Sequence, residues 1–257
     1  KMFLSFSAKD TNHNLELVKT DLLRIASWCC TNHLLLNPDK TKLAMFGTHQ
    51  MLKCVAPQSI MVLGNELKIS DSVKDLGIIL DSQFSFNDHI DYLVPSLMSK
   101  LCSINRINHL LDHKTIITII HSLVFSKLYY CSCVWAGMSK KNITRLQQVQ
   151  NFAARIICKK RKYEHVSPIL KQLKLLPVSE TLELRDLIFM HKILNGVAPH
   201  YLSSLIRKRS EVSLRTTRSS HQVHVPFART SLYQNSFFIR ASKAWNSLPK
   251  EQTEIKS

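Results

Sequence analysis

Lysine and arginine are the residues of this sequence best suited to a chemical role, because some of them directly follow a turn and others stand in short runs. Lys40 and Lys42 come directly after the turn residues 37–39 (Asn-Pro-Asp), and residues 159–162 read Lys-Lys-Arg-Lys. Lysine and arginine bind phosphate oxygens and offset their negative charge. Acidic residues are nowhere adjacent in the chain, and none precedes Asp10. Two-metal catalysis needs clustered carboxylates, so the sequence favours polyanion binding over metal chemistry.

A helix before Lys40 and a strand after Lys42 must position these two lysines. Apolar residues at 3.6-residue spacing predict an amphipathic helix that ends near Thr31. They are Leu15, Val18, Leu22, Ile25 and Cys29. Residues 43–46 are apolar and stop at Gly47, which predicts a short buried strand. On this pattern alone, the two lysines are solvated turn charges.

The positive charge of the chain is concentrated in its second half. The 257 residues carry 35 Lys and Arg against 18 Asp and Glu, a formal net charge of +17. Residues 1–100 hold 10 of each sign, whereas residues 101–257 hold 25 basic and 8 acidic residues. A strongly basic surface attracts phosphate backbones through counterion release and without sequence preference. Nucleic acid is therefore the expected partner of the second half, and a generally basic helical domain is the alternative.

The sequence gives little support for a membrane protein or for a disulfide-rich protein. No run approaches the roughly 18 apolar residues of a spanning helix, and no signal-peptide core stands at the N-terminus, so no membrane association is expected. Seven cysteines at irregular spacing form no disulfide framework. Cys131 and Cys133 lack the second pair that a zinc site needs, so reduced cysteines without a metal are expected. Free thiols suit the cytosol or the nucleus.

Strand patterns occupy much of the first hundred residues. Residues 60–69 predict a hairpin that turns at Gly64 and Asn65. Residues 73–80 predict a third strand, in which Gly77 permits close backbone approach. Residues 1–7 place Met2, Leu4 and Phe6 at alternate positions and predict one more strand.

Helical periodicity dominates from residue 87 onward. An apolar stripe over residues 90–104 is interrupted by Pro95, which is expected to kink or restart the helix. Residues 113–124 are apolar on more than one face and predict the buried centre of a bundle. Residues 180–194 predict a helix that ends at Asn195-Gly196. Residues 237–248 predict a last helix whose Trp245 packs into the core.

The helix predicted over residues 141–158 combines an apolar stripe with a polar, cationic side. It runs into the cationic residues 159–162, so residues 139–174 contain ten basic residues and a single acid, Glu164. Phosphate contacts from such a helix position a nucleic acid without reading its sequence. A solvated charge run and a nuclear localisation signal are the alternatives. Residues 207–229 are rich in Ser, Thr, Arg and His and predict an irregular basic stretch that becomes ordered on RNA.

Four separate stretches resemble one known family. The region around Lys40 resembles the motif that follows the catalytic aspartates in the palm of reverse transcriptases of non-LTR (LINE-type, jockey/CR1-like) retrotransposons. Its matching residues are Trp28, Asn32, Leu36, Asn37, Lys40, Thr41, Lys42 and Phe46. Residues 72–81, 149–157 and 236–249 support the same family in the same order. The resemblance covers nearly the whole chain, and four motifs in register argue against chance.

The resemblance implies an α+β fold with a partial reverse-transcriptase palm. Residues 1–85 would form the C-terminal part of the palm with a primer-grip-like hairpin, an incomplete antiparallel sheet plus a helix. Residues 86–165 would form a helical thumb-like region, and residues 166–257 a basic helical C-terminal region. The partners expected are RNA, DNA and RNA/DNA hybrids, in the nucleus and cytoplasm. Magnesium is expected in the intact parent enzyme, and no cofactor in this chain.

One departure from the family pattern decides the expected activity. In the family a Tyr/Phe-X-Asp-Asp hairpin lies just before residues 2–7, whereas this sequence begins at Lys1. We therefore expect the C-terminal part of an RNA-directed DNA polymerase, without its catalytic aspartates, that contributes binding of template, primer and element RNA. A stand-alone basic nucleic-acid-binding module and an inactive element remnant are the alternatives.

The resemblance also assigns roles to individual cations. Lys40 matches the position of a general acid toward the pyrophosphate leaving group, with Lys42 as the second candidate. Lys74 lies in the stretch that resembles the primer grip and is expected to face phosphate; the alternative there is an ordinary core strand. The residues expected to bind nucleic acid are Lys74, Lys140, Lys141, Arg145, Arg155, Lys159, Lys160, Arg161, Lys162, Arg207, Lys208 and Arg209.

Overall fold

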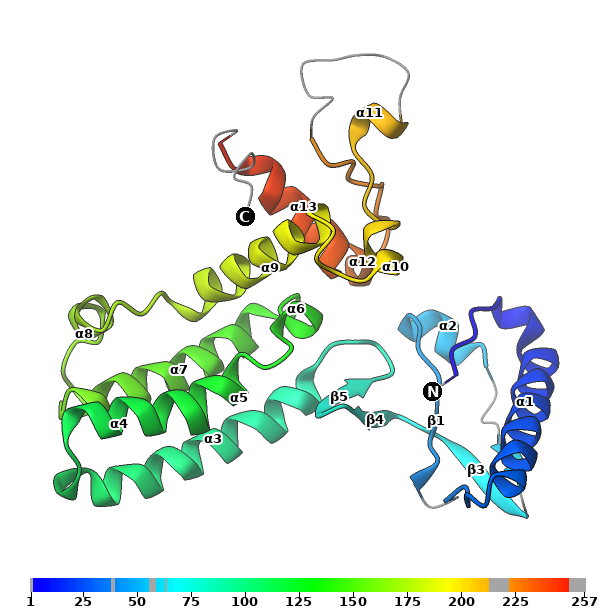
Figure 1. Cartoon of the computed structure of the whole chain (residues 1–257), viewed down its shortest axis with the longest axis horizontal. Coiled ribbons are helices and arrows are strands. Elements are labelled where there is room, and N and C mark those ends of the chain that lie inside the picture. The colour runs from blue at the N-terminus through cyan, green and yellow to red at the C-terminus, as the bar shows by residue number, and fades with distance from the viewer. Residues whose placement is uncertain (1, 38–39, 56–58, 63, 213–221, 250–257) are drawn as a thin grey trace. The chain divides into compact units, whose positions relative to one another are not determined.

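The structure, a computed structural model, describes residues 2–37, 40–55, 59–62, 64–212 and 222–249 (Figure 1). The chain forms two compact units, Lys1–Asp88 and His89–Ser257. The first combines a long helix with short strands, and the second is built from helices, so the fold is α+β as predicted. The further division of the second unit at residue 165 stays a prediction.

The first helix of the first unit follows the sequence pattern closely. A short 3-10 turn, η1 (Ala8–Asp10), leads into α1 (Thr11–Thr31), which ends where the pattern predicted. The chain leaves α1 through His33, whose φ of 55° is left-handed, and the Leu34 N–H donates to the Cys29 carbonyl at 2.8 Å. This 6→1 hydrogen bond closes a Schellman motif and satisfies a terminal carbonyl of the helix.

The sheet of the first unit packs against α1. Strand β3 (Asn65–Ser70) lies between β1 (Leu43–Ala44), which is parallel to it, and β2 (Ser59–Val62), which is antiparallel. The sheet is therefore mixed and not antiparallel as predicted. The chain turns from β2 to β3 at Gly64, whose φ is 77°, so the predicted hairpin is confirmed. The core contains Leu15, Ile60, Val62 and Leu67, with Val18, Leu22 and Leu43 packed around them. Ile25, predicted to belong to the apolar stripe, is 39% exposed.

The single strand predicted over residues 73–80 is wrong. A second hairpin replaces it, with β4 (Ser72–Asp75) antiparallel to β5 (Ile78–Asp81). The reversal occurs at Leu76 and Gly77, whose φ angles are 44° and 91°. A two-residue hairpin turn favours positive φ at its central positions, and Gly77 provides this where Leu76 must adopt it against its side chain. Gly77 therefore forms part of the hairpin turn and does not lie within a strand.

The strand predicted for residues 1–7 does not form over the described residues 2–7. These residues run irregularly into η1, and Phe3 is 81% exposed. A strand forms by pairing with a neighbour, and no described strand of the first unit pairs with this segment.

The second unit begins with a bundle of helices that run side by side (Figure 1). After α3 (Asn87–Ile107) and the short η3 (Asn108–Leu110) come α4 (His113–Ile120), a π-helical turn η4 (His121–Phe125) and α5 (Ser126–Leu128). Next are α6 (Ser132–Trp135) and α7 (Lys140–Ile157). The fully buried residues of the bundle include Ile90, Leu97, Leu101, Ile116, Ile120, Leu128, Trp135 and Leu146. Of the element predicted to be the buried centre, Ile116, Ile120 and Val124 lie in the core, whereas Leu123 is 47% exposed, so only one face of it is buried.

Pro95 was predicted to kink or restart the helix; the restart does not occur, and the kink stays a prediction. The helix is continuous from Asn87 to Ile107 with Pro95 inside it. Proline removes one backbone hydrogen bond, but Pro95 lies on the exposed side of the helix, where water can hydrate the freed carbonyl. The buried stripe on the opposite side holds the helix together.

The remaining helices pack around α9 (Val178–Leu194), which contacts α6, α7 and α13 (Phe237–Ser247). The shorter helices are α8 (Ser167–Gln172), α10 (His200–Ser203), α11 (Arg209–Val212) and α12 (Ser231–Gln234). Helix α9 ends at Asn195 and Gly196, with a φ of 71° at Gly196, as predicted. Trp245 packs against the buried cluster of Met190, Val223 and Ala241, also as predicted.

The basic stretch predicted to be irregular is partly structured. Residues 209–212 form α11, and Lys208 pairs with Val223 in an isolated antiparallel bridge. The stretch also includes residues 213–221, which lie outside the described residues.

A buried ion pair joins α13 to α9. Arg240 Nε lies 2.7 Å from Asp186 Oδ2, and Arg240 Nη2 lies 3.2 Å from Asp186 Oδ1. The same guanidinium donates to the Cys133 carbonyl at 3.0 Å and to the Asn235 carbonyl at 2.6 Å. Asp186 is only 2% exposed, so its charge depends on Arg240. Arg240 belongs to the predicted family motif over residues 236–249, and its contacts here are internal.

Replacing Gly137 with alanine is expected to lower the free energy of unfolding by about 3 kcal/mol, the upper end of overpacking costs. A Cβ on Gly137 would lie 2.1 Å from the Asn235 carbonyl oxygen and 2.8 Å from Arg240 Nη1. Urea unfolding of both proteins measures the effect. Gly47→Ala is the control, because its Cβ would meet Leu52 Cγ at an ordinary 3.6 Å. Equal stability of the two variants would contradict the close approach.

Cys133 is expected to resist alkylation at pH 8, whereas Cys131 reacts. Burial, with Asp186 nearby, raises the pKa of the Cys133 thiol to about 12. Only about one Cys133 in 10⁴ is then a thiolate at pH 8, and the thiolate is the reactive form. Cys131 is exposed. Iodoacetamide labelling followed by peptide mass spectrometry compares the two sites, and comparable labelling would contradict the environment described for Cys133.

Candidate nucleic-acid interface

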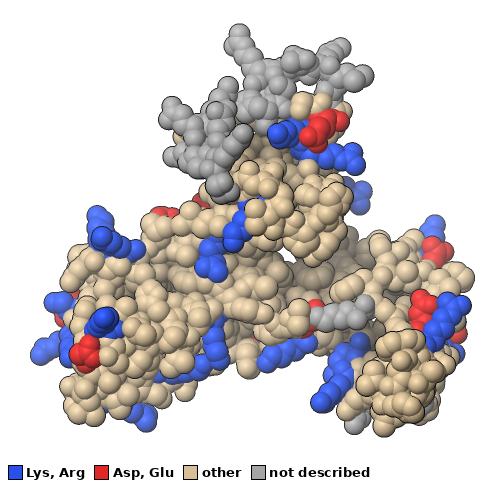
Figure 2. All heavy atoms as spheres, viewed as in Figure 1, with Lys and Arg blue, Asp and Glu red and all other residues tan. Residues whose placement is uncertain are grey.

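The charge of the chain follows the division into units. Residues 1–88 carry nine Lys and Arg and nine Asp and Glu, whereas residues 89–257 carry 26 against nine. On the face drawn in Figure 2, Lys and Arg side chains are spread over the helical unit and acidic side chains are few. A polyanion is therefore attracted to the second unit.

Helix α7 presents cations at its first turn. The Ser139 hydroxyl accepts from the Asn142 N–H at 3.4 Å and caps the helix, and Lys140 and Lys141 follow it on the exposed surface. A helix N-terminus carries partial positive charge, so these lysines add to a potential that already favours anions. Arg145, the next predicted residue, instead forms an ion pair with Asp91 at 2.6 Å, which partly neutralises it.

Glutamines on α7 hold the following segment. The Gln150 amide donates to the Leu176 carbonyl at 2.8 Å, and the Gln147 side-chain oxygen accepts from the Val178 N–H at 2.8 Å. Gln150 also donates to the Tyr129 hydroxyl at 3.1 Å. Gln147 thus connects α7 to the start of α9.

The cationic residues 159–162 are folded into a compact turn. Lys159 has a left-handed φ of 51°, and the Lys160 N–H donates to the Arg155 carbonyl at 2.9 Å, which forms a Schellman motif. Glu164 then accepts from the Arg161 N–H at 2.8 Å and pairs with Lys160 Nζ at 3.0 Å. These two interactions lower the pKa of Glu164, the Arg161 bond most, so the turn stays closed at neutral pH. The four cations are thus presented together.

A pair of lysines that the sequence did not suggest lies on neighbouring helices. Lys100 on α3 faces Lys127 on α5, and the proximity of Lys127 together with burial lowers the pKa of Lys100. Like charges held close together repel each other, and a bound anion relieves that repulsion. The pair could not be recognised from the sequence because its members are 27 positions apart.

The backbone fixes a second group of predicted cations, at residues 207–209. The Arg209 N–H donates to the Gln222 carbonyl at 2.9 Å, and the His224 N–H donates to the Arg207 carbonyl at 2.8 Å. Arg207 and Lys208 have exposed side chains. These three residues therefore stand on a short paired segment.

Lys40 and Lys42 are exposed residues of the first unit. Asn37 organises their turn, because its side-chain oxygen accepts from the Lys40 N–H at 3.2 Å and its carbonyl accepts from the Thr41 hydroxyl at 2.8 Å. Lys74 lies exposed on β4, opposite Ile79 on β5.

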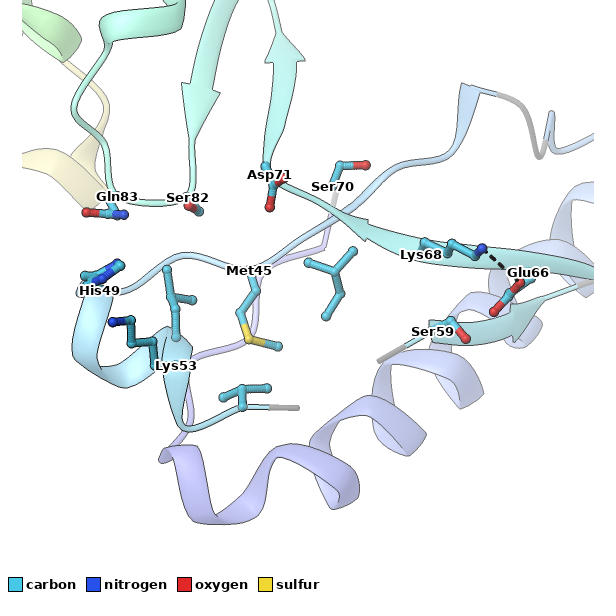
Figure 3. A pocket seen from close by; sticks show the side chains of 13 residues that line it. Met45, His49, Lys53, Ser59, Glu66, Lys68, Ser70, Asp71, Ser82 and Gln83 are labelled. Carbon is cyan, nitrogen blue, oxygen red and sulfur yellow. Dashed lines mark ion pairs between the residues drawn. The ribbon is translucent and has the colours of Figure 1, made fainter. Parts of the chain in front are cut away.

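A pocket of about 670 Å³ lies in the first unit (Figure 3). Its labelled polar residues include His49 and Lys53 from α2 (His49–Lys53), Lys68 from β3, and Asp71. Lys68 forms an ion pair with Glu66 at 3.8 Å. The pocket lining does not include Lys40, Lys42 or Lys74, so the structure does not bring these three predicted residues together there.

The described residues contain neither a metal-ligand cluster nor a membrane-spanning helix. Within these ranges, no group of three or more His, Cys, Asp and Glu side chains is arranged to hold a metal ion. Among the described helices, none combines the length and hydrophobicity needed to cross a bilayer.

Comparison with known proteins links the chain to a transposon enzyme. It is 26% identical over 184 residues to a Drosophila melanogaster protein described as a probable RNA-directed DNA polymerase from transposon BS. The match covers 69% of this chain and 20% of that protein, so the chain spans about a fifth of its length. No protein-family model matches, and no solved structure gives a significant match. The similarity supports a chain related to a retrotransposon reverse transcriptase.

Proposed function

We propose that this chain is the C-terminal part of a non-LTR retrotransposon reverse transcriptase and that it binds the nucleic acids on which the parent enzyme acts. The similarity to a transposon RNA-directed DNA polymerase supports the enzyme class. The observation that carries the binding role is the charge of the helical unit, with 26 basic against nine acidic residues. The first unit has no net charge and corresponds in this proposal to the end of the palm.

The binding role divides along the chain. The helical region to about residue 165 acts as a thumb whose α7 cations contact phosphates of a template and primer duplex. The basic region from residue 166 onward, including Arg207 and Lys208, contacts element RNA or target DNA. Such contacts position the nucleic acid and read no sequence. Residues 159–162 also fit a nuclear localisation signal, consistent with a protein that acts in the nucleus after synthesis in the cytoplasm.

Magnesium chemistry is not assigned to this chain. Two-metal nucleotidyl transfer needs clustered carboxylates, and the part of the chain that the structure describes offers no such cluster. The catalytic aspartates would belong to another part of the parent enzyme.

Salt dependence tests the binding proposal. A labelled RNA/DNA hybrid is titrated with the whole chain at several salt concentrations. The affinity should fall linearly in a log-log plot, with a slope of about −0.9 for each phosphate contact on a B-form duplex and a coefficient of similar size on a hybrid. An affinity that does not change with salt would contradict an electrostatic interface.

The two alternatives to the polymerase proposal differ in whether they bind nucleic acid. A stand-alone module binds with the same salt dependence, whereas an inactive remnant shows neither binding nor cooperative unfolding. Sequencing the DNA upstream of the Lys1 codon separates the module from the polymerase. An open frame that encodes an Asp-Asp hairpin supports the polymerase, and a stop codon or unrelated exon supports the module.

In a full-length enzyme that contains this segment, Lys40→Ala is expected to slow nucleotide addition about 100-fold, the low end of general acid contributions. Lys40 is exposed on a turn that Asn37 holds, so its side chain is free of a structural duty in the turn. Single-turnover extension of a primer measures the rate, and primer affinity should not change. Lys53→Ala is the matched control. Unchanged turnover in Lys40→Ala would remove the assignment.

A further inference from the structure

A second, smaller hollow lies in the helical unit where the end of α3 and η3 meet the end of α7. Its volume is about 290 Å³, and its lining consists of Asn105, Asn108, His109, Arg155, Lys159 and Lys160. Three of the six residues are permanent cations and the others are polar, so the hollow suits an anion rather than an apolar ligand.

Two of the residues that line the hollow each carry a buried polar atom without a hydrogen-bond partner. Asn108 is 9% exposed, and its Nδ2 donates to the Ile156 carbonyl at 3.0 Å. A peptide carbonyl can only accept, so this bond fixes the amide orientation and leaves Asn108 Oδ1 as the unpaired atom. Over the described residues, Asn108 Oδ1 and Arg155 Nε are the buried side-chain atoms without a hydrogen-bond partner. Both belong to residues of the same hollow, and unsatisfied buried groups are rare in folded proteins.

The carbonyl oxygens at the C-terminal end of α7 would repel an anion, but they already accept hydrogen bonds from other groups of the protein. The Arg155 carbonyl accepts from the Lys160 N–H, and the Ile156 carbonyl accepts from both the Lys159 N–H and Asn108. The Ile157 carbonyl lies 3.2 Å from His113 Nδ1, which must donate because the carbonyl cannot. The partial negative charge of the helix end is thereby offset.

The cations of the hollow are held in place from outside it. Arg155 Nη2 donates to the Glu164 carbonyl at 3.3 Å, and Arg155 Nε is a buried donor without a partner. Lys160 pairs with the Glu164 carboxylate at 3.0 Å, whereas Lys159 has an exposed side chain. Glu164 thus neutralises one of the three positive charges and leaves two for an incoming anion.

The geometry points to a binding site for a single phosphate group, supplied by the nucleic-acid backbone. Arg155 and Lys159 bind the phosphate oxygens, Lys160 adds charge, and Asn105 offers an amide donor. Asn108 Oδ1 is an acceptor, so it binds water or a sugar hydroxyl rather than the phosphate itself. The assignment of the phosphate to a backbone rests on the proposed function, whereas the phosphate site itself does not.

Inorganic pyrophosphate is the probe for the site, and the whole chain is the protein. Pyrophosphate should raise the unfolding midpoint of the wild-type chain, and Lys159→Gln should weaken its binding at least about tenfold, as expected for the loss of a charge-assisted contact. Arg155→Gln should have a similar effect. Lys243→Gln, an exposed cation on α13 that does not line the hollow, is the matched control and should bind normally. An equal loss in this control, or no effect of pyrophosphate, would overturn the site.

Competition then identifies the source of the phosphate. An RNA/DNA hybrid should displace pyrophosphate from the wild-type chain, and Lys159→Gln should weaken hybrid binding. If the hybrid binds without displacing pyrophosphate, the backbone assignment is wrong and the site takes free phosphate. If the hybrid does not bind at all while pyrophosphate does, the proposed function fails and the phosphate site stands.

Discussion

Replacing Arg240 with methionine is expected to lower the free energy of unfolding by about 3–5 kcal/mol, the cost of breaking a buried ion pair from one side. Asp186 is 2% exposed and would lose the cation that pairs with it. The carbonyls of Cys133 and Asn235 would also lose the donors that Arg240 provides. Urea unfolding followed by tryptophan fluorescence measures the change, because Trp135 is fully buried in the same unit.

Two further variants show whether the effect comes from the ion pair. Lys243→Met removes an exposed cation from the same helix and should change stability by less than about 0.5 kcal/mol. The double variant Arg240→Met with Asp186→Leu removes both charges and should be more stable than Arg240→Met alone. A single variant within about 1 kcal/mol of the wild type would show that Asp186 finds other compensation.

Replacing the four cations at residues 159–162 with glutamine is expected to weaken hybrid binding about 100-fold or more at low salt. The compact turn held by Glu164 presents these cations together, so one duplex can contact several of them. The log-log salt slope should become shallower by up to about 3.6, or about 0.9 for each lost contact. Fluorescence anisotropy with a labelled hybrid gives both quantities.

A control variant that loses the same number of positive charges elsewhere distinguishes the effect of their position from the effect of net charge. Lys9, Arg24, Lys53 and Lys68 are exposed cations of the first unit, and replacing all four with glutamine removes the same charge. This control should weaken binding only a few-fold through the long-range field, which salt screens. An equal loss in both variants would mean that net charge, and not the turn after α7, determines the affinity.

The sequence predicted elements whose signals are local. The end of α1 near Thr31 follows from apolar periodicity, and the turn at Gly64 and the end of α9 at Gly196 follow from glycine. The prediction failed at Leu76, where a continuous Val and Ile pattern concealed a hairpin. The restart predicted at Pro95 does not occur, because burial of the opposite face of the helix outweighs a lost hydrogen bond. Local patterns do not report which tertiary contacts outweigh them.

The candidate interface was likewise predictable only in part. The sequence shows which residues are cations, but it does not show which groups surround them. For example, Arg145 on α7 forms an ion pair with Asp91 on α3. The Asp186–Arg240 pair joins residues 54 positions apart, and the hollow beside Arg155 needs Asn108 from another helical segment. These contacts arise from helix packing, which a single sequence does not specify. The palm and thumb assignments, the individual site residues and the location in the cell stay predictions.

Photo-crosslinking tests the central claim, that the helical unit carries the nucleic-acid contact, most directly. An RNA/DNA hybrid with 4-thiouridine in its RNA strand is bound to the whole chain and irradiated, and the crosslinked peptides are identified by mass spectrometry. The proposal predicts crosslinks in residues 140–174 and few in residues 2–88. Crosslinks confined to the first unit, or none under conditions where the hybrid binds, would contradict it.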